Sequence, residues 1–559
     1  MTCRLYFMLY QSDTLMKLVS DPKFAKIYWL LLGFNLASST PCLFVLAGIS
    51  IWIGVIGLSA LTALTETLLV MWIGHRNKVL SHVILTFCIA LNIIFLIVDI
   101  YLLQTFDMII GYQALRLTLV STSAEIAEFA ANYLSLRIIA KTLAIAALAA
   151  GVIWAIACIV TRSVSTRVSF IISLTLSASG IVMMLWIVIR YAIVGSYNDD
   201  HQCTALSRIA FSISRTFVEN ARVNKFIDIT KNTPAEGSPE FDVILILGES
   251  YNRLHSPLYG YDKPTTPNLA ALAADSSLIV YSDVIAPGDW TEEAVKGIFS
   301  LSNSADTYFT APFFPALFKK SGYYTAIYEN QYTLGASECL LSDRELSDLS
   351  FDFRDDTRTR YDHQLTENIK PAAKNGLYII HLYGQHYEYA DRYPSEWQYF
   401  TAADYDDSKF TANQRTILAN YDNATRYNDF VIKGILDKWQ HRRAIAIYLS
   451  DHGEEVFDCR DYFGHGNSAS APDPMYQLRV PMMIWMSDSF QKHYPLKVTA
   501  IHNSANLPVS TNDISHTLLD AANIVTPAFD PTRSLLSPAY NASGERKISF
   551  YGASSATVQ

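Results

Sequence analysis

The first third of the chain holds a long run without charged side chains, at residues 27–65, and Glu66 is the only charged residue between this run and His75. One membrane-spanning helix needs about 20 apolar residues, so the run is too long for one span and suits two. We therefore predict spans over 27–48 and 51–74, joined by a tight uncharged turn at 48–50.

The apolar excess of the chain is confined to this first third. Of the 559 residues, 50% are hydrophobic and only 17% are charged, and further apolar runs at 80–103, 142–161 and 168–194 bring the prediction to about five spans. The remainder has the composition of a slightly acidic globular domain. We predict an α-helical membrane domain over 1–198 with a loop at 104–141, a connector over 199–240 and a soluble domain over 241–559.

Lysines and arginines indicate the orientation. They precede the first span, follow the second and separate the fourth from the fifth, so all of these fall on one side (Arg4, Lys17, Lys23, Lys26, Arg76, Lys78, Arg162, Arg167). The opposite loop, at 104–141, mixes acidic and basic residues. By the positive-inside rule the N-terminus is cytoplasmic and everything after the fifth span lies outside. Four spans would place the soluble domain inside, which this pattern disfavours, and the start lacks a signal-peptide cleavage site.

The connector carries a helical pattern. Leu206, Ile209, Ile213 and Phe217 recur at helical spacing, with arginines on other faces. This suits a helix lying on the membrane surface and equally an amphipathic helix packed on the soluble domain. A linker rich in Pro, Gly and Ser follows within 231–240.

Charge and cysteine content exclude some classes of protein. The net charge of -9 leaves no basic surface for nucleic acid. The seven cysteines include no CxxC pair, which argues against a zinc ribbon or a dense disulfide framework. For Cys339 and Cys459 in the soluble domain, one bridge and two free thiols are equally compatible with the sequence.

The soluble domain alternates short apolar runs with helical patterns. Continuous apolar runs of this kind predict a largely parallel sheet covered by helices on both faces. The ligand of such a sheet binds beyond the C-terminal ends of its strands. The runs lie at 242–250, 324–331, 376–386, 443–453 and 480–487.

Several of these runs end in metal-ligand side chains. The first ends at Glu249, the third at His386 and the fourth at Asp451 and His452, and His465 follows soon after. A single strand-end histidine is usually structural, but independent strands that deliver such residues to one edge predict a metal site. Mixed carboxylate and imidazole ligands suit zinc or manganese rather than calcium.

A nucleophile candidate lies in 286–301. Pro287 and Gly288 form a turn signal, Asp289 is a candidate N-cap, and Thr291 then falls in the first turn of a helix. Free N–H groups in that turn attract phosphate, and a bound metal ion would activate the otherwise inert hydroxyl. Taken alone, the local pattern favours an ordinary helix start.

Together these runs resemble the bacterial phosphoethanolamine transferases, in the sulfatase branch of the alkaline phosphatase superfamily. The resemblance covers nearly the whole chain, membrane spans included, and implies an α/β sulfatase-like fold for the soluble domain. Its runs are GES, SPLYGY and TTPNL within 242–272, the threonine-bearing helix start at 291, GQHYEYADRYP at 384–394, YLSDHGEE at 448–455 and GHG at 464–466.

The resemblance implies a Zn²⁺ site and the roles of its residues. The family's metal ligands map onto Glu249, Thr291, Asp451 and His452, with Thr291 as the nucleophile. Its phosphate-contacting or second-zinc histidines map onto His386 and His465.

It also implies the reaction and its location. Thr291 would take phosphoethanolamine from phosphatidylethanolamine, release diacylglycerol and pass the group to lipopolysaccharide (lipid A or a core sugar) or another envelope glycan. The protein would be a monomer that crosses the bacterial inner membrane several times, with its catalytic domain in the periplasm.

The loop at 118–129 resembles the family's periplasmic helix that approaches the lipid. Glu125 matches, Ser121 replaces the usual Thr, and Leu117 stands where an Asn is expected. An interfacial helix without substrate contacts is an equal alternative. Asn330, at the end of the second strand run, is a further candidate for substrate contact.

Two departures and three rival functions stay open. No cysteine lies near Thr291, whereas lipid A-modifying members carry a disulfide there, which leaves a core sugar or another glycan open as acceptor. Glu292 and Glu293 should repel phosphate unless they face away or hold the ethanolamine ammonium. The rivals are a phosphoglycerol transferase of the lipoteichoic-acid-synthase type, a membrane-tethered sulfatase or phosphodiesterase, and a non-catalytic sensor, which the intact ligand set disfavours.

Overall fold

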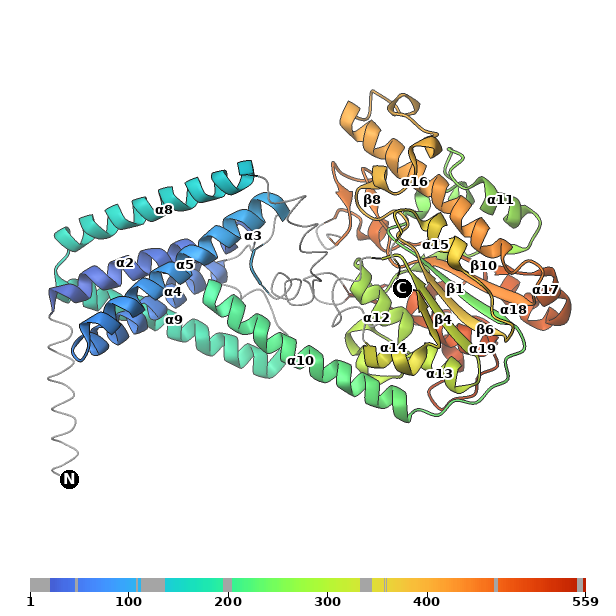
Figure 1. The fold of residues 1–559 in the computed structure, drawn as a ribbon, viewed down its shortest axis with the longest axis horizontal. Coiled ribbons are helices and arrows are strands. Elements are labelled where there is room, and N and C mark those ends of the chain that lie inside the picture. The colour runs from blue at the N-terminus through green and yellow to red at the C-terminus, as the bar shows by residue number, and fades with distance from the viewer. Residues whose placement is uncertain are drawn as a thin grey trace. The chain divides into compact units, whose positions relative to one another are not determined.

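The chain forms two compact units, Met1–Glu219 and Asn220–Gln559 (Figure 1). The computed structural model describes residues 21–45, 49–106, 109–111, 136–194, 204–331, 344–355, 357, 359–466, 471–549 and 556–558. The boundary falls inside α10 (Ala205–Asn232), which is the helix predicted for the connector.

The first unit is helical. Among its described residues, four segments are long and apolar enough to cross a membrane: Ile51–Gly74, Lys78–Gln104, Leu136–Ser163 and Thr166–Ile189. They confirm the second to fifth predicted spans. The helices are α2 (Pro22–Ser39), α3 (Cys42–Val45), α4 (Ile49–Gly74), α5 (Lys78–Phe106), α8 (Leu136–Ser163) and α9 (Thr166–Val194).

The first predicted span, over 27–48, differs from the prediction. Its helix α2 has 18 residues and ends at Ser39, two residues before Pro41, which has no N–H to continue the helical hydrogen bonds. At 1.5 Å per residue, α2 is about 27 Å long, slightly short of a bilayer core. It still packs in the bundle, where Asn35 donates to Glu66 at 2.9 Å and Ser38 to Asn92 at 2.6 Å. By length and composition, four of the described helices could therefore cross a membrane, against about five predicted, and α2 is a fifth helix packed in the same bundle.

A buried ion pair ties α5 to α10. Arg208 and Asp99 pair with both side chains 0% exposed. The Nε of Arg208 donates to the carbonyl of Ile110 at 2.8 Å, and the amide of Ile110 donates to Asp99 Oδ1 at 2.7 Å. Three segments of the first unit are thus joined by one charged cluster.

Arg208→Ala is expected to lower the free energy of unfolding by about 3–5 kcal/mol, because it leaves a buried carboxylate without its partner. The double variant Asp99→Leu/Arg208→Met removes both charges and should recover most of that loss. Thermal unfolding of the detergent-purified protein measures both effects. A single variant as stable as the wild type would contradict this account.

In the second unit, seven strands form one sheet in the order β2-β10-β7-β1-β6-β4-β5. All five predicted strand runs form strands of this sheet: β1, β4, β6, β7 and β10. The seven strands are β1 (Asp242–Gly248), β2 (Leu278–Val280), β4 (Tyr324–Glu329), β5 (Phe353–Asp355), β6 (Gly376–His381), β7 (Ala444–Ser450) and β10 (Met482–Met486).

Strand directions are parallel from β7 to β5, as predicted, but β10 runs antiparallel to both of its neighbours. A parallel return needs a long crossover, usually a helix. Between β7 and β10 the described chain instead forms the hairpin β8 (Glu455–Val456) and β9 (Phe463–Gly464) and one turn of 3₁₀ helix. The other short pairs are β3 (Asp283–Ile285) with β11 (Pro508–Ser510) and β12 (Arg546–Ile548) with β13 (Ala556–Val558).

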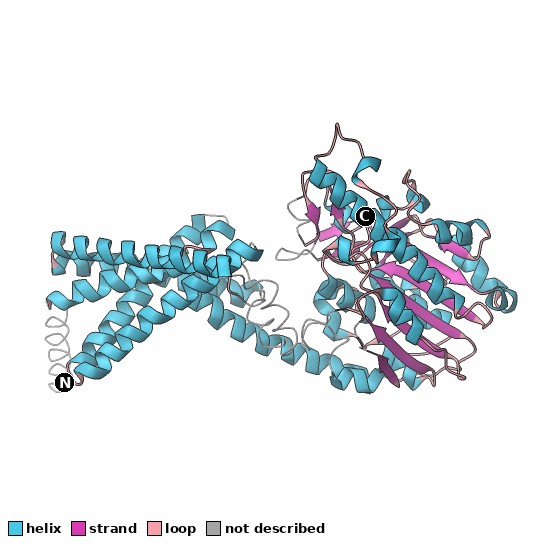
Figure 2. Ribbon diagram, turned by 45° about the horizontal axis from the view of Figure 1, so that its top comes forward, coloured by secondary structure: helices cyan, strands magenta, loops and turns pink. Residues whose placement is uncertain are grey.

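Helices cover both faces of the sheet (Figure 2). Alternate residues of β1 enter two different cores, Val243 and Leu245 on one face and Ile244 and Ile246 on the other. The first core includes α12 (Thr291–Phe299), α13 (Phe314–Lys320), α14 (Arg344–Ser350), α17 (Asp488–His493), α18 (Pro495–Ser504) and α19 (Ile514–Ala521). The second includes α11 (Pro267–Ala274), α15 (Asp362–Asn368) and α16 (Ala412–Asp437).

The two halves of α10 have different surroundings. Val223, Phe226 and Ile227 of its second half are buried in the first of these cores. In its first half, Leu206 and Phe217 are 51% and 72% exposed. The second half of α10 therefore packs on the soluble domain, which is one of the two predicted alternatives. For the first half, contact with the membrane surface stays a prediction.

Candidate active site

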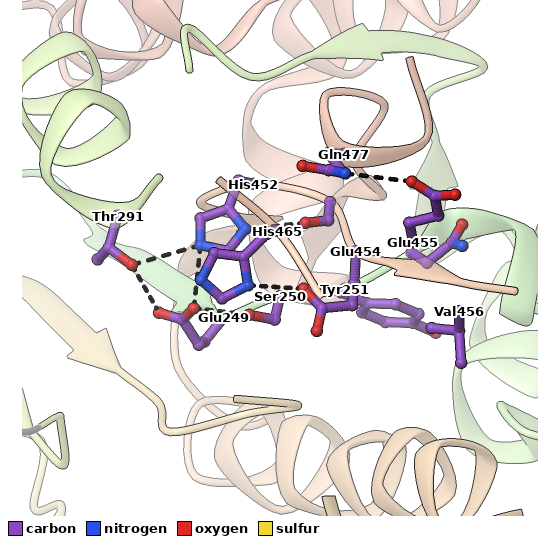
Figure 3. Close-up of polar contacts among 12 residues, drawn as sticks. Glu249, Ser250, Tyr251, Thr291, His452, Glu454, Glu455, Val456, His465 and Gln477 are labelled. Carbon is purple, nitrogen blue, oxygen red and sulfur yellow. Dashed lines mark hydrogen bonds and ion pairs between the residues drawn. The ribbon is translucent and has the colours of Figure 1, made fainter. Parts of the chain in front are cut away.

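Four elements bring the predicted site residues together at the C-terminal edge of the sheet. Glu249 follows β1, Asp451 and His452 follow β7, Thr291 begins α12, and His465 follows β9. Because β1 and β7 are parallel neighbours, their ends lie side by side, with Gly248 paired to Ser450. Figure 3 shows the side chains of Thr291, Glu249, His452 and His465 pointing toward one another.

The threonine hydroxyl lies against two of the predicted ligands. Its Oγ1 is 3.3 Å from Glu249 Oε2 and 3.3 Å from His452 Nε2. The same nitrogen is 3.1 Å from Glu249 Oε1. Thr291 is the first residue of α12, so the free N–H groups of that helix start lie beside its hydroxyl.

The orientation of His452 is set by its other nitrogen. Nδ1 lies 2.8 Å from the carbonyl of Gly453, which only accepts, so Nδ1 carries the hydrogen of the neutral ring. Nε2 therefore faces the carboxylates, and it is the nitrogen that would bind a metal once its proton is lost. A histidine held by a carbonyl on one nitrogen is the usual arrangement of a metal ligand.

Asp451 has one oxygen engaged and one free. Oδ1 accepts from the amides of His452 at 2.7 Å and Ser250 at 3.2 Å. Among the described residues, the buried Oδ2 has no hydrogen-bond partner, and it lies 3.3 Å from His452 Nε2. A buried carboxylate oxygen in this state is costly unless a cation completes it.

The donor atoms fit a zinc ion. One ligand atom each from Glu249, His452 and His465 lie within 4.8 Å of one another. Carboxylate and imidazole donors together with a hydroxyl match the ligand chemistry of Zn²⁺, and the unpartnered oxygen of Asp451 supplies a further donor. The residues therefore fit the metal that the sequence predicts.

Protonation of the cluster also points to a cation. Burial lowers the pKa of His452, but the charges of Asp451 and Glu249 outweigh burial and raise this pKa to about 10. Burial and the charge of Glu249 raise the pKa of Asp451 to about 7. Burial would raise the pKa of Glu249, but His452 holds it well below its usual range. Without a metal, the cluster thus neutralises its acids with protons that a cation would displace.

Glu249 is held from three sides. Gln331 Nε2 donates to its Oε2 at 2.7 Å, and the hydroxyl of Ser250 donates to Oε1 at 2.8 Å. Gly384 has a φ of +48°, and a Cβ there would lie 2.9 Å from the Glu249 amide and carbonyl. Only glycine allows this approach, which fixes the backbone of the ligand.

His465 belongs to this cluster, and His386 lies beside it. The His465 ring lies 4.2 Å from that of His452 and 6.4 Å from that of His386, between ring centroids. His386 Nδ1 is buried without a hydrogen-bond partner among the described residues. Burial lowers the pKa of His386 to about 4, so its ring is neutral at pH 7.

The two glutamates after Thr291 do not leave bare charges beside it. Glu292 pairs with Lys296 one turn along α12. Burial, with the charge of Glu292, raises the pKa of Glu293 to about 8, so Glu293 is largely neutral at pH 7. The repulsion of phosphate expected from the sequence is therefore weakened by pairing and by protonation.

The weaker candidates have different outcomes. Asn330 is buried, donates to Asp362 at 2.7 Å and accepts from the amide of Thr359 at 2.8 Å, so its amide orders a loop. Its neighbour Gln331 is the one that contacts Glu249. Glu125 and Ser121 lie outside the described residues, as does Cys339, whereas Cys459 is a free thiol.

Sequence reasoning missed two contacts. Glu454 lies 2.7 Å from His465 Nδ1, and Gln331 bonds to Glu249. The only signal for Glu454 was its place two residues after the ligand His452 in DHGEE. A contact across a hairpin depends on strand register, which that run does not reveal.

Comparison with known proteins agrees with this geometry. A family model described as Sulfatase matches residues 242–524. Phosphoethanolamine transferase EptC of Escherichia coli (strain K12) is 28% identical over 319 residues, which cover 54% of this chain and 54% of that protein. The chain thus spans about half the length of the curated relatives it matches.

Two solved structures are similar in fold. The C-terminal periplasmic domain of EcEptC from Escherichia coli, in complex with Zn, has a TM-score of 0.52 and 27% identity and covers 58% of this chain and 94% of that one. The integral membrane lipooligosaccharide phosphoethanolamine transferase A (EptA) from Neisseria meningitidis has a TM-score of 0.56 at 17% identity, over 93% of this chain and 98% of that one. The latter likeness is one of fold alone. This chain belongs to the sulfatase family, and the curated relatives that it matches are named phosphoethanolamine transferases.

Proposed function

We propose that the protein is a zinc-dependent phosphoethanolamine transferase of the bacterial inner membrane. Its donor is phosphatidylethanolamine, and its acceptor is a hydroxyl of lipopolysaccharide (lipid A or a core sugar) or of another envelope glycan. The observation that carries the proposal is the position of the Thr291 hydroxyl, 3.3 Å from both Glu249 and His452 at the start of a helix.

Two further observations support this function. The site lies in the part of the chain that matches the sulfatase model, and the chain is 28% identical over 319 residues to a phosphoethanolamine transferase. The helices long and apolar enough to cross a membrane belong to the other unit of the same chain, so one molecule combines a membrane anchor with the site. A donor that is itself a membrane lipid suits such a chain, with the catalytic domain in the periplasm and the protein acting as a monomer.

In the first step, the Thr291 oxygen attacks phosphorus, and the bond from phosphorus to the diacylglycerol oxygen breaks. The hydroxyl proton of Thr291 passes to Glu249 Oε2, the carboxylate oxygen 3.3 Å away. Diacylglycerol leaves after taking up a proton, and phosphoethanolamine remains esterified to Thr291. Free N–H groups of the first turn of α12 stabilise the phosphoryl oxygens.

In the second step, an acceptor hydroxyl attacks the same phosphorus, the bond to Thr291 breaks, and the threonine hydroxyl is restored. His386 and His465 contact phosphoryl oxygens or bind a second metal. A bound Zn²⁺ would lower the pKa of the threonine hydroxyl and neutralise charge on the phosphoryl group. Glu249, Asp451, His452 and Thr291 would hold it, and His465 is a further candidate ligand of the same ion.

The residues proposed to approach the lipid are Glu125 and Ser121. Both remain assigned by resemblance of their loop to the family's periplasmic helix. Asn330 supports the site through its loop, where its amide bonds to Asp362 and Thr359.

A choice between donor lipids tests the proposal. Detergent-purified protein with Zn²⁺ should release fluorescent diacylglycerol from labelled phosphatidylethanolamine and much less from labelled phosphatidylglycerol. Release from phosphatidylglycerol alone would overturn the proposal in favour of phosphoglycerol transfer. Release of free phosphoethanolamine at the same rate with and without lipopolysaccharide would indicate a phosphodiesterase.

A further inference from the structure

A second carboxylate lies behind the ligand cluster and contacts one histidine. Glu454 Oε2 is 2.7 Å from His465 Nδ1, and the side chain of Glu454 is 0% exposed. Its other oxygen, Oε1, accepts a hydrogen bond from the hydroxyl of Tyr389. Tyr389, Glu454 and His465 thus form one chain of hydrogen bonds, in which Tyr389 and Glu454 are buried and His465 is partly exposed. Figure 3 shows Glu454 on the side of His465 away from Thr291.

The register of a short hairpin produces this contact. In it, Val456 pairs with Phe463 and Glu455 with Gly464, so the next pair along is Glu454 and His465. Residues directly opposite on antiparallel strands bring their side chains together. Glu455 lies on the other face, where it accepts from Arg460 at 3.1 Å and Gln477 at 3.2 Å.

The contact decides which nitrogen of His465 is free. A carboxylate oxygen only accepts, so Nδ1 carries the hydrogen, and Nε2 keeps its lone pair. We infer that Glu454 is a positioning residue that holds His465 as an Nε2 metal ligand, with Tyr389 fixing the carboxylate from behind. A carboxylate behind a ligating histidine both orients the ring and raises its basicity.

The surroundings restrain every member of this chain. Tyr389 packs in an apolar cluster with Tyr421 and Val456, and its ring lies 4.9 Å from that of Tyr421. Trp290 lies 5.4 Å from the His465 ring on another side. Gly466 has a φ of +72°, and a Cβ there would lie 2.7 Å from the Trp290 ring, so only glycine lets the indole approach.

Glu455 provides a matched control. It is the neighbouring glutamate and is also 0% exposed. Its carboxylate is engaged by Arg460 and Gln477, not by His465. Glu455→Gln therefore makes the same chemical change, one residue away, without touching the histidine.

The test measures zinc affinity of the full-length protein by competition with a fluorescent chelator. Glu454→Gln should weaken the tightest zinc binding about 10–100-fold, the range for loss of such a partner. Tyr389→Phe removes one hydrogen bond and should weaken it about fivefold, but should add little in the Glu454→Gln background. Glu455→Gln should stay within about twofold of the wild type, because its charge faces away from the metal.

Several outcomes would overturn the inference. They are wild-type affinity in Glu454→Gln, equal losses in Glu454→Gln and Glu455→Gln, or a His465→Ala variant that binds zinc as tightly as the wild type. Thermal unfolding of each variant shows whether it is folded, and Tyr389→Phe keeps the test decisive if Glu454→Gln is not.

The inference rests on the proposed metal-dependent function, but the two fail differently. A wild-type protein that binds zinc through His465 and releases no diacylglycerol from phosphatidylethanolamine would overturn the function and leave the positioning role of Glu454 standing. Active wild type with unchanged zinc affinity in Glu454→Gln would do the reverse.

Discussion

Thr291→Ala is expected to lower diacylglycerol release from phosphatidylethanolamine by at least about 10⁴-fold, because the variant has no oxygen to attack phosphorus. The structure places the hydroxyl at the N-terminus of a helix, 3.3 Å from both Glu249 Oε2 and His452 Nε2. No other hydroxyl among the described residues has this combination of neighbours. Loss of the nucleophile should therefore remove the chemistry while leaving the fold intact.

Two measurements follow the loss. Chromatography of fluorescent lipid reports diacylglycerol, and intact mass reports a phosphoethanolamine adduct on the wild type that is absent from the variant. Thr291→Ser keeps the hydroxyl and should retain measurable activity. Thr310→Ala makes the same change at an exposed threonine and should behave as the wild type. Turnover by Thr291→Ala at the wild-type rate would refute the nucleophile assignment.

Removal of metal is expected to lower activity at least about 10³-fold, with recovery on addition of Zn²⁺, because the cation activates the hydroxyl and neutralises the phosphoryl oxygens. The buried, unpartnered oxygen of Asp451 and the convergence of Glu249, His452 and His465 within 4.8 Å are the structural grounds. Asp451→Asn keeps the size of the side chain and removes its charge, so it should bind zinc more weakly. Unchanged activity after thorough chelation would contradict the mechanism.

The pH dependence of zinc binding follows from the same cluster. Burial lowers the pKa of His452, but the charges of Asp451 and Glu249 raise it to about 10. Metal-free His452 is therefore protonated at pH 7. Zinc must displace that proton, and its affinity should fall as pH falls, by about tenfold per pH unit for each proton displaced. Calorimetry in two buffers of different ionisation enthalpy should show at least one proton released per zinc at pH 7. Binding without proton release would contradict this protonation state.

Much of the site was predictable because its ligands follow strands directly. An apolar run that ends at Glu249, or at Asp451 and His452, predicts both the strand and the position of its end. Parallel strands all end at one edge, so the order of residues alone was enough to assign independent runs to one site. Thr291 needed more, since its local pattern is that of an ordinary helix start.

Contacts that depend on strand register, and protonation states that depend on burial, were not predictable from the sequence. Glu454 faces His465 because of the pairing of two-residue strands, and Glu293 is largely neutral because its surroundings bury it. Strand β10 was predicted as a strand, but its antiparallel direction depends on the path that leads to it, which in its described part holds a hairpin and one 3₁₀ turn in place of a crossover helix. The end of α2 at Ser39, and the hydrogen bond from Asn35 to Glu66 in the bundle, were likewise not predictable from local sequence.

The sequence by itself determined the separation of a membrane unit from a soluble α/β unit, the strands of the sheet and the residue types at their ends. These properties follow from hydropathy and periodicity, which are local in the chain. Only the tertiary structure decided which atoms face one another: the free oxygen of Asp451, the acceptors of Thr291, and the carboxylate behind His465. Those depend on packing between segments far apart in sequence, and the chemistry of the site depends on distances of a few ångströms that no local pattern specifies.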